Sequence, residues 1–289
     1  MMLAESIIHS IDPYVFRIGG VGPRWYGMAY VTGFVLGWLL LHWLARTRRI
    51  LLSPQQVADF VFYVIVGVVA GGRLGHVLLY DPHLLWTFTP TVPWWSAIDI
   101  TKGGMSSHGG IIGVTLAAWL FARRAGVPFM HLMDCAAIGA PPGLALGRLA
   151  NWVNGELLGK PLPEEWWGNP PRWSLKFPRE ILDDHFIRVA ELQALRTPKF
   201  VDPAAPFPDS LVIAFERGNQ IVMDALTPLL TPRWPSQFFQ ALTDGPVLLA
   251  VLVAVAARPR RPGVVSGWFF LAYGVLRMIT EQFRQADEG

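Results

Sequence analysis

A few basic side chains stand inside or at the ends of long apolar stretches of this sequence, and these residues are the most able to do chemistry. They are Arg73, Arg148 and Arg277, together with His108, which two glycines follow. A charge inside an apolar segment is costly and is kept mostly where it works or is paired. Arginine offers a planar, permanently charged fork for phosphate oxygens, and histidine titrates near neutral pH. The set therefore predicts a site for an anionic, phosphate-bearing group.

The apolar stretches that position these residues are long enough to cross a membrane. Of 289 residues, 52% are hydrophobic and only 16% are charged, whereas about 25% are charged in soluble domains. A membrane span needs about 20 mostly apolar residues. Six segments qualify, at residues 26–44, 57–79, 105–122, 130–150, 237–257 and 264–283. We therefore expect an all-α polytopic membrane protein with about six transmembrane helices, the fourth kinked at Pro141 and Pro142.

Arginines in three short loops orient these segments. They follow the first, third and fifth segments, and they are Arg46, Arg48, Arg49, Arg123, Arg124, Arg258, Arg260 and Arg261. By the positive-inside rule these loops are cytoplasmic. The N-terminus, the connection at 80–104, the segment 151–236 and the C-terminus then lie outside. We expect four transmembrane helices within residues 1–150, a partly irregular extracytoplasmic head at 151–236, and two helices at 237–289 that complete one membrane domain.

The remaining composition narrows the classes of function. The net charge is +3, but only four residues are lysine, and the arginines fall between apolar segments, so no nucleic-acid partner is expected. The single cysteine, Cys135, cannot form a disulfide within the chain and is expected in the core. His131 and Asp134 are two ligands at helical spacing near the inner end, which is too little for a metal site. The sequence carries no metal or nucleotide motif, and we expect no cofactor.

Nine polar residues inside or at the ends of the spans share one depth. In the expected topology they all fall in the outer half of the membrane, and they are Tyr26, Arg73, His108, Arg148, Asn151, Asp244, Arg277, Glu281 and Arg284. Helices of opposite direction have no packing reason to agree on that depth. The pattern therefore predicts a shared, wetted cavity that opens to the outer leaflet and holds an anionic head group.

Three of these residues also have a purely structural interpretation. Arg277 and Glu281 are spaced i, i+4 and can neutralise one another as a helix pair. Arg73 follows two glycines, and small residues of this kind let helix backbones approach closely. The residues alone leave both interpretations open.

Five stretches of the sequence resemble the bacterial prolipoprotein diacylglyceryl transferase family. Residues 147–159, the signature segment, read Gly-Arg-Leu-Ala-Asn-Trp-Val-Asn-Gly-Glu-Leu-Leu-Gly; the other four, in the family's order, are 25–27, 71–73, 103–110 and 273–277 with Glu281 and Arg284. The resemblance implies an enzyme of the bacterial plasma (inner) membrane whose active site faces the outer leaflet. It implies transfer of the diacylglyceryl group of phosphatidylglycerol to the lipobox cysteine thiol in a prolipoprotein signal peptide, with release of glycerol phosphate.

The resemblance also implies roles for individual residues. His108 would help to deprotonate the incoming thiol or organise the site around it, since a positive cavity alone could also lower the thiol pKa. Arg148 and Arg277 would stabilise charge on the departing phosphate. Tyr26 would complete the catalytic set by positioning the head group. The expected substrate-binding residues are Arg73, Arg148, Asn151, Asn154, Glu156, Gly159, Tyr273, Glu281 and Arg284.

The sequence departs from the family in two places. Members commonly read His-Pro-Ser-Gln-Leu-Tyr-Glu before the fifth span, and residues 234–240 here read Trp-Pro-Ser-Gln-Phe-Phe-Gln. Asp244 lies one helical turn beyond Gln240, and we expect it to supply the missing carboxylate. The family also usually has a seventh span, and this sequence ends at Gly289. The competing functions are a small transporter for an anionic solute or lipid, for which no polar route to the inner face is seen, and a scaffold whose Arg–Glu pairs only join helices.

Overall fold

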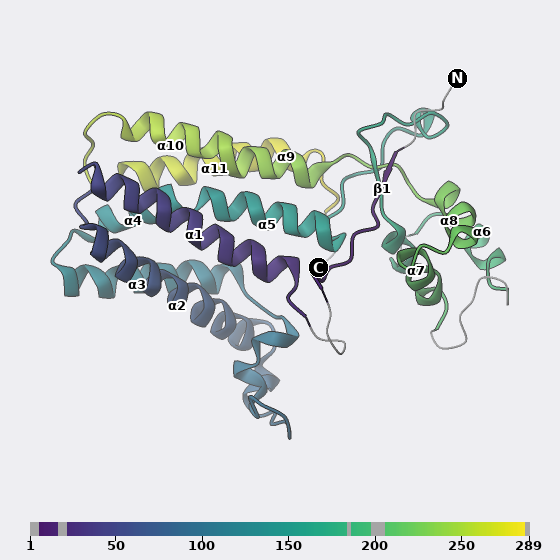
Figure 1. Ribbon diagram of the computed structural model, residues 1–289, viewed down its shortest axis with the longest axis horizontal. Coiled ribbons are helices and arrows are strands. Elements are labelled where there is room, and N and C mark those ends of the chain that lie inside the picture. Colours follow the sequence, from purple (N-terminus) through teal and green to yellow (C-terminus); the bar gives the residue numbers. More distant parts are fainter. Residues whose placement is uncertain (1–5, 17–21, 184–185, 198–205, 287–289) are drawn as a thin grey trace. The chain divides into compact units, whose positions relative to one another are not determined.

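The computed structural model describes residues 6–16, 22–183, 186–197 and 206–286, and these residues are mostly helical (Figure 1). The chain divides into two compact units. Unit 1 contains residues 1–31, 144–247 and 273–289, and unit 2 contains residues 32–143 and 248–272. The division of the chain by membrane location, expected at residues 151 and 237, stays a prediction.

Each of the six predicted segments is helical. The long helices are α1 (Trp25–Arg46), α2 (Pro54–Leu79), α3 (Ser107–Ala125), α4 (Phe129–Gly139), α5 (Pro141–Asn154), α9 (Ser236–Leu242), α10 (Leu248–Ala256) and α11 (Val264–Glu281). The fourth predicted segment breaks between α4 and α5, where Pro141 begins the second helix, as expected. A π-helical turn, Thr243–Val247, joins α9 to α10. Among the described residues, the helices Trp25–Arg46, Pro54–Leu79 and Ser236–Ala256 are long and apolar enough to cross a membrane.

Polar caps fix where the helices of unit 2 begin. Ser53 accepts a hydrogen bond from Gln56, which returns one to the Ser53 backbone, and this capping box starts α2. Ser106 caps α3 by accepting a hydrogen bond from the Gly109 N–H. The carboxylate of Asp134, on α4, accepts hydrogen bonds from the backbone N–H groups of Gly263 (2.8 Å) and Ser266 (2.7 Å). Asp134 therefore caps α11 from another helix, and this is its structural role.

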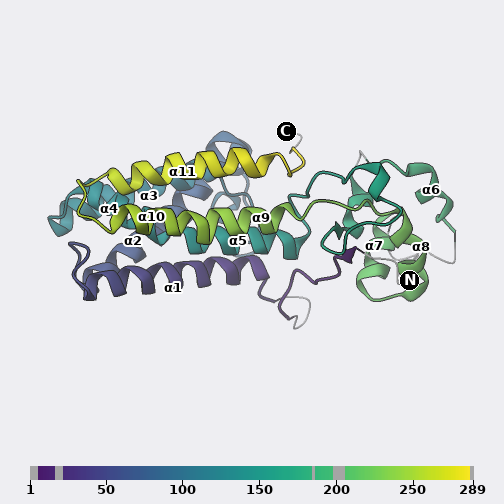
Figure 2. The same ribbon diagram turned by 90° about the horizontal axis from the view of Figure 1, so that it is seen from above.

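Glycines let α2 and α3 lie against each other in unit 2 (Figures 1 and 2). An added Cβ on Gly113 would lie 1.9 Å from the carbonyl oxygen of Gly67, and one on Gly109 would lie 2.2 Å from that of Gly71. The two backbones are thus in direct contact, as in membrane helix pairs built on small residues.

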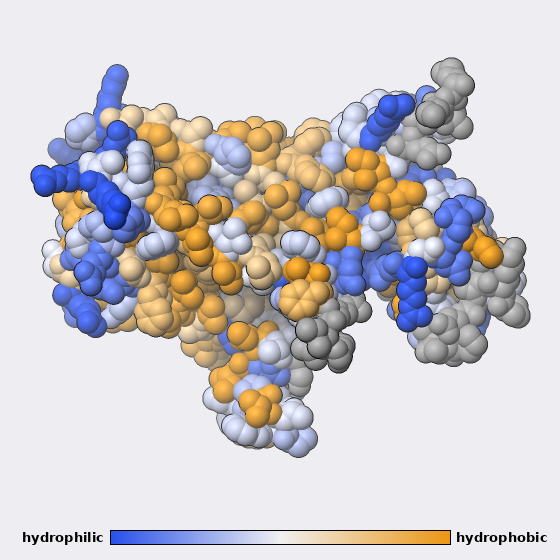
Figure 3. Space-filling view, in the orientation of Figure 1, coloured by the Kyte–Doolittle hydropathy of each residue, from blue (hydrophilic) through white to orange (hydrophobic). Residues whose placement is uncertain are grey.

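The large apolar side chains of these helices point outward. On α3 the exposed residues are Ile111, Ile112, Leu116, Trp119 and Leu120, while the buried face is mainly glycine and alanine. Figure 3 shows a mostly apolar surface over the long helices, with hydrophilic residues gathered at the left-hand end of unit 2. Small residues inside and large apolar residues outside suit a lipid solvent. A core of larger residues, including Leu41, Phe60, Phe121 and Leu132, lies at the same end of the unit, and Cys135 is buried in it as expected.

The residues of unit 1 between α5 and α9 form a small head, partly irregular as expected. Strand β1 (Ile7–Ile8) pairs in parallel with β2 (Leu175–Lys176), with Ile7 opposite Leu175. Helices α6 (Val189–Ala194), α7 (Asp209–Glu216) and α8 (Gln220–Leu226) lie close together in the head (Figure 2). Short helical turns complete the described residues, at Glu164–Trp166, Pro178–Leu182 and Thr227–Leu229 in unit 1 and at Pro82–Leu85, Ser96–Ile98 and Ile100–Lys102 in unit 2. The head core is formed by Ile181, Phe186, Leu211, Phe215, Leu226 and neighbouring residues.

Candidate functional site

The signature segment forms the second half of α5 and the turn that follows it. The turn reverses at Gly155 (φ 68°) and Leu157 (φ 53°), and the Glu156 N–H donates to the Asn151 carbonyl (2.9 Å). Gly155 takes the left-handed conformation that commonly ends a helix. The helix therefore carries Arg148 and Asn151, and the turn carries Asn154, Glu156 and Gly159. Asn154 donates to the Glu156 carboxylate at 3.4 Å.

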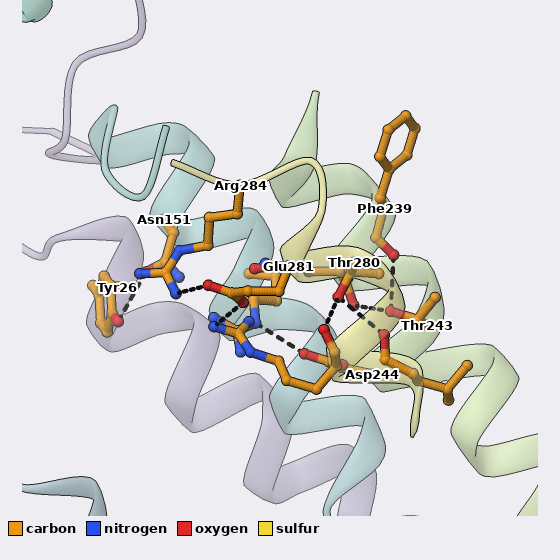
Figure 4. Close-up of polar contacts among 12 residues, drawn as sticks. Tyr26, Asn151, Phe239, Thr243, Asp244, Thr280, Glu281 and Arg284 are labelled. Atoms are coloured by element: carbon orange, nitrogen blue, oxygen red, sulfur yellow. Dashed lines mark hydrogen bonds and ion pairs between the residues drawn. The ribbon is translucent and has the colours of Figure 1, made fainter. Parts of the chain in front are cut away.

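Asn151 joins the signature segment to α1. The Tyr26 hydroxyl, in the first turn of α1, donates to the Asn151 side-chain oxygen at 3.0 Å. Asn151 is buried, with 5% of its surface exposed. Figure 4 shows the Tyr26 and Asn151 side chains next to each other. Two residues predicted for the site are thus in contact although they are 125 positions apart.

Arg148 is paired with the buried carboxylate of Asp244. Its Nε donates to Asp244 Oδ2 at 3.0 Å, and the exposed fraction is 16% for Arg148 and zero for Asp244. Asp244 lies in the π-helical turn, which also contains Pro246. Such turns inside helices are rare and often occur at functional sites. The predicted replacement of the missing carboxylate by Asp244 is compatible with this geometry and stays a prediction.

The end of α11 carries a second charged group of three residues. Arg277 Nη2 lies 2.8 Å from Glu281 Oε2, and Arg284 Nη1 lies 3.2 Å from Glu281 Oε1. The i, i+4 pair expected from the sequence is therefore formed, and Arg284 is added to it. Arg277 Nη1 is buried and, among the described residues, has no hydrogen-bond partner. A buried N–H without an acceptor is costly, which favours an anionic ligand there.

Backbone pairing brings these groups to the signature segment. The N–H of Lys160 donates to the Phe283 carbonyl (2.9 Å), and the N–H of Gln285 donates to the Leu158 carbonyl (3.0 Å). The Gln237 amide, at the start of α9, donates to the Glu156 carbonyl at 2.9 Å. The turn after α5 is thus held between α9 and the residues after α11. Figure 4 shows Asn151, Asp244, Glu281 and Arg284 from these elements gathered in one region.

Gly159 is the point of closest backbone approach in this region. An added Cβ would lie 1.9 Å from the Trp234 carbonyl oxygen, so no other residue fits there without a backbone shift. The sequence did not single out Arg233, which proves central to the same junction. Its guanidinium is buried, bonds Glu180 at 2.7 Å, and donates to the Gly159 carbonyl (3.1 Å) and to the Gln285 side chain (2.6 Å). Its one sequence signal is an arginine in a proline-rich stretch, which is weak.

The other predicted site residues of unit 2 lie on the α2–α3 pair. Arg73 is buried and hydrogen-bonds backbone carbonyls in the connection to α3. His108 is exposed in the first turn of α3. Tyr273, by contrast, lies half-buried on α11 in unit 1. Because the predicted cavity joins residues of both units, the meeting of Arg73 and His108 with Arg148 and Arg277 stays a prediction.

The arrangement can bind and stabilise negative charge. Arg148 and Arg277 are each oriented by a carboxylate on one side, which can pre-organise the guanidinium for a phosphate on another. In the described part of the chain, no group of three or more His, Cys, Asp or Glu side chains is placed to hold a metal ion.

These features define a helical integral membrane protein with partly buried arginines, oriented by carboxylates, at the ends of its helices. Comparison with known proteins agrees with this class. The chain belongs to the family described as prolipoprotein diacylglyceryl transferase, whose sequence pattern matches residues 13–289.

Curated relatives are similar over nearly the whole chain. The phosphatidylglycerol–prolipoprotein diacylglyceryl transferase of Bdellovibrio bacteriovorus is 35% identical over 97% of this chain and 85% of its own length. Relatives of the same name from Gluconacetobacter diazotrophicus and Azospirillum brasilense are 34% and 35% identical, over 99% and 96% of this chain and 82% and 83% of their own lengths.

Proposed function

We propose that this protein transfers the diacylglyceryl group of phosphatidylglycerol to the lipobox cysteine thiol of prolipoproteins. The observation that carries this function is the match to the transferase family over residues 13–289, in a chain whose relatives of that name align over nearly its full length. The protein is thus a transferase of lipoprotein biosynthesis that modifies other proteins and takes a lipid as the donor.

The reaction is a displacement at a glycerol carbon. The cysteine sulfur forms a C–S thioether bond, the C–O bond to the phosphate breaks, and glycerol phosphate leaves with the electron pair. The thiol proton must be removed before or during attack. The enzyme therefore has two tasks, generating a thiolate and stabilising the negative charge that grows on the departing phosphate.

Arg148 and Arg277 perform the second task in our proposal. The Asp244 carboxylate holds the Arg148 guanidinium through Nε, and Glu281 holds Arg277 through Nη2. The remaining N–H groups then face the phosphate, and the buried Arg277 Nη1 has no other acceptor among the described residues. Pre-oriented donors of this kind stabilise developing charge without having to reorganise during the reaction.

The neighbouring residues orient the substrates. Tyr26 and Asn151, joined by their 3.0 Å hydrogen bond, contact the head group in this proposal. Asn154, Glu156 and Tyr273 position the head group and peptide, Gly159 lets the backbone approach closely, and Glu281 and Arg284 complete the charged set.

His108 is the proposed acceptor of the thiol proton. It is exposed and lies in the first turn of α3, with Gly109 behind it in contact with α2. A thiol has an ordinary pKa of about 8.5, so a nearby imidazole can accept its proton near neutral pH. Replacing His108 with Asn tests this role, because near-normal turnover would remove it.

We further propose that all six predicted segments cross the bacterial inner membrane, with the site towards the outer leaflet and residues 151–236 outside. The arginine loops and the outward apolar side chains of α3 support this topology. Phosphatidylglycerol then reaches the site from the bilayer, and the signal peptide of the prolipoprotein meets it there.

A reconstituted assay tests the function. The purified protein is mixed with phosphatidylglycerol vesicles and a lipobox peptide, and the peptide mass and released glycerol phosphate are measured. We expect a diacylglyceryl mass increase on the peptide, which a Cys→Ser peptide does not show. Flux of an anionic solute or lipid without thioether formation would instead identify a transporter and overturn the proposal.

A further inference from the structure

The side chain of Arg73 is saturated with neutral acceptors from its own unit. Its Nε donates to the Ala97 carbonyl (2.8 Å), its Nη1 to the carbonyls of Gly103 (2.6 Å) and Gly104 (3.0 Å), and its Nη2 to the Ser96 carbonyl (2.6 Å). Four of its five N–H groups are therefore used. Only 7% of the residue is exposed. One N–H of Nη2 remains, so a phosphate could bind this guanidinium through two N–H groups only by displacing bonds that are already short.

The carbonyls that Arg73 holds belong to the connection that leads directly into α3. Beyond Gly104, the Ser106 N–H donates to the Gly72 carbonyl at 2.8 Å, and the Ser106 hydroxyl caps α3 through Gly109. His108 follows in the first turn of that helix. One side chain on α2 thus fixes the path of the connection from residue 96 to the start of the helix that carries His108.

The two glycines at the end of this connection are adapted to that contact. Gly103 and Gly104 both have positive φ, 83° and 79°, a conformation that other residues rarely adopt. An added Cβ on Gly104 would lie 2.9 Å from Arg73 Nη1 and 2.4 Å from His76 Nε2. An added Cβ on Gly103 would meet no atom within 4 Å. Gly104 is needed for space and conformation, and Gly103 for conformation alone.

We propose that Arg73 is a positioning residue for the transfer reaction. It fixes the connection 96–106 and thereby the position of His108. This role replaces the substrate-binding role that the resemblance implies, so Arg73 does not bind the phosphate. The inference rests on the proposed function for its kinetic consequence. The structural contact on which it depends can be tested without any activity.

Hydrogen exchange tests the contact in purified protein without substrate. In Arg73→Gln we expect the amides of residues 103–106 to exchange about tenfold faster, because the acceptors that ordered this segment lose their donors. The matched control is Arg124→Gln, since Arg124 is an exposed arginine on α3 that donates only to the Tyr63 hydroxyl at 3.3 Å among described residues. Equal exchange in the wild type and Arg73→Gln would overturn the proposal.

Kinetics separate positioning from phosphate binding. For Arg73→Ala we expect kcat to fall about 100-fold, the effect of a displacement of about 1 Å at a reacting group, with the KM for phosphatidylglycerol within about twofold. Added guanidinium ion should restore part of kcat, because it can reoccupy the carbonyl cradle. A large rise in KM with kcat unchanged would instead assign the phosphate to Arg73.

Two further variants keep the test decisive if Arg73→Ala does not fold. Gly103→Ala leaves the Arg73 side chain intact and strains only the backbone whose carbonyls accept its hydrogen bonds. It should therefore also lower kcat without raising KM. In an Arg73→Gln/His108→Asn double variant the losses should not multiply, because both act through one group. Multiplying losses would overturn the proposal. If the wild type forms no thioether, the proposed function fails, while hydrogen exchange still decides the Arg73 contact.

Discussion

Arginines appear in two regions of this protein with opposite surroundings. On α2, Arg73 donates to four backbone carbonyls and is 7% exposed. In unit 1, Arg148 and Arg277 each bond a carboxylate, and Arg277 Nη1 has no acceptor among the described residues. On α2, the carbonyl acceptors occupy most N–H groups of the Arg73 guanidinium and fix a loop. In unit 1, a carboxylate on one side orients each guanidinium and leaves N–H donors for a ligand. The same residue type thus serves structure in one region and, in the proposed function, chemistry in the other.

The largest expected effect tests the ligand-binding side of this comparison. Arg148→Gln removes the charge that is proposed to meet the departing phosphate, and we expect kcat/KM to fall about 1000-fold, the upper range for loss of one transition-state donor. The control is Arg179→Gln, an arginine of the same unit that pairs with Glu216 on the surface. Thioether formation by Arg148→Gln within tenfold of the wild type would show that Arg148 is only structural.

The second prediction concerns the glycine contact between α2 and α3. In Gly113→Ala the new methyl group would collide with the Gly67 carbonyl, at 1.9 Å, and we expect the free energy of unfolding to fall by about 3 kcal/mol. The control is Gly267→Ala on α11, where an added Cβ meets nothing within 4 Å. Thermal unfolding in detergent measures both, and an unchanged midpoint for Gly113→Ala would mean that the helices do not touch there.

Much of the fold follows from the sequence because it depends on local pattern. Six apolar segments became helices, Pro141 broke the fourth, and Arg277 paired with Glu281 at the expected spacing. The hydrogen-bond partners of Arg73 could not be predicted. Every residue has a backbone carbonyl, and nothing in the sequence indicates which four carbonyls lie around this guanidinium.

Long-range polar partners were only partly predictable. Asp244 could be proposed from its helical face, yet its bond to Arg148 spans 96 positions and depends on the π-helical turn, for which no sequence pattern was found. Asp134 was rejected as a metal ligand, and its use as a cap for α11 could not be derived, because backbone N–H donors at a helix start have no sequence signature of their own.

The third prediction tests whether the carboxylate orients Arg148. Asp244→Asn keeps a hydrogen-bond acceptor but removes the charge, and we expect kcat to fall about tenfold, with Asp244→Ala falling further because Arg148 then loses its partner. Asp224→Asn, an exposed aspartate on α8 that accepts from Gln220, is the control. Full activity of Asp244→Asn would show that Asp244 does not replace the carboxylate that other family members carry at the position of Gln240.

A smaller effect is expected at the start of α11. Asp134→Ala removes the acceptor of the Gly263 and Ser266 N–H groups, and we expect a loss of about 1–2 kcal/mol in the free energy of unfolding, as for other lost helix caps. Asp134→Asn should lose less. Asp59→Ala, an exposed acid on α2, should change little. Asp134 and Arg277 lie in different units. If Asp134→Ala lowers the free energy of unfolding but leaves kcat and KM unchanged, the role of Asp134 is separate from that of the charged site.

The smallest effect concerns protonation of the signature segment's neighbour, His9. Its ring is 7% exposed, stacks on Phe177 and donates to the Val153 carbonyl at 3.1 Å. Burial lowers the pKa of His9, against which the carbonyl bond acts only in part. The unfolded chain therefore binds a proton first as the pH falls below about 6.5, so this group weakens the fold as the pH falls below that value and has no effect above it. After division by the intrinsic exchange rate at each pH, the protection of the amides of residues 150–156 should fall between pH 7.5 and 5.5. The fall should be smaller in His9→Gln, and as in the wild type in His83→Gln, whose ring is exposed. An identical pH response in His9→Gln would remove the buried imidazole as its cause.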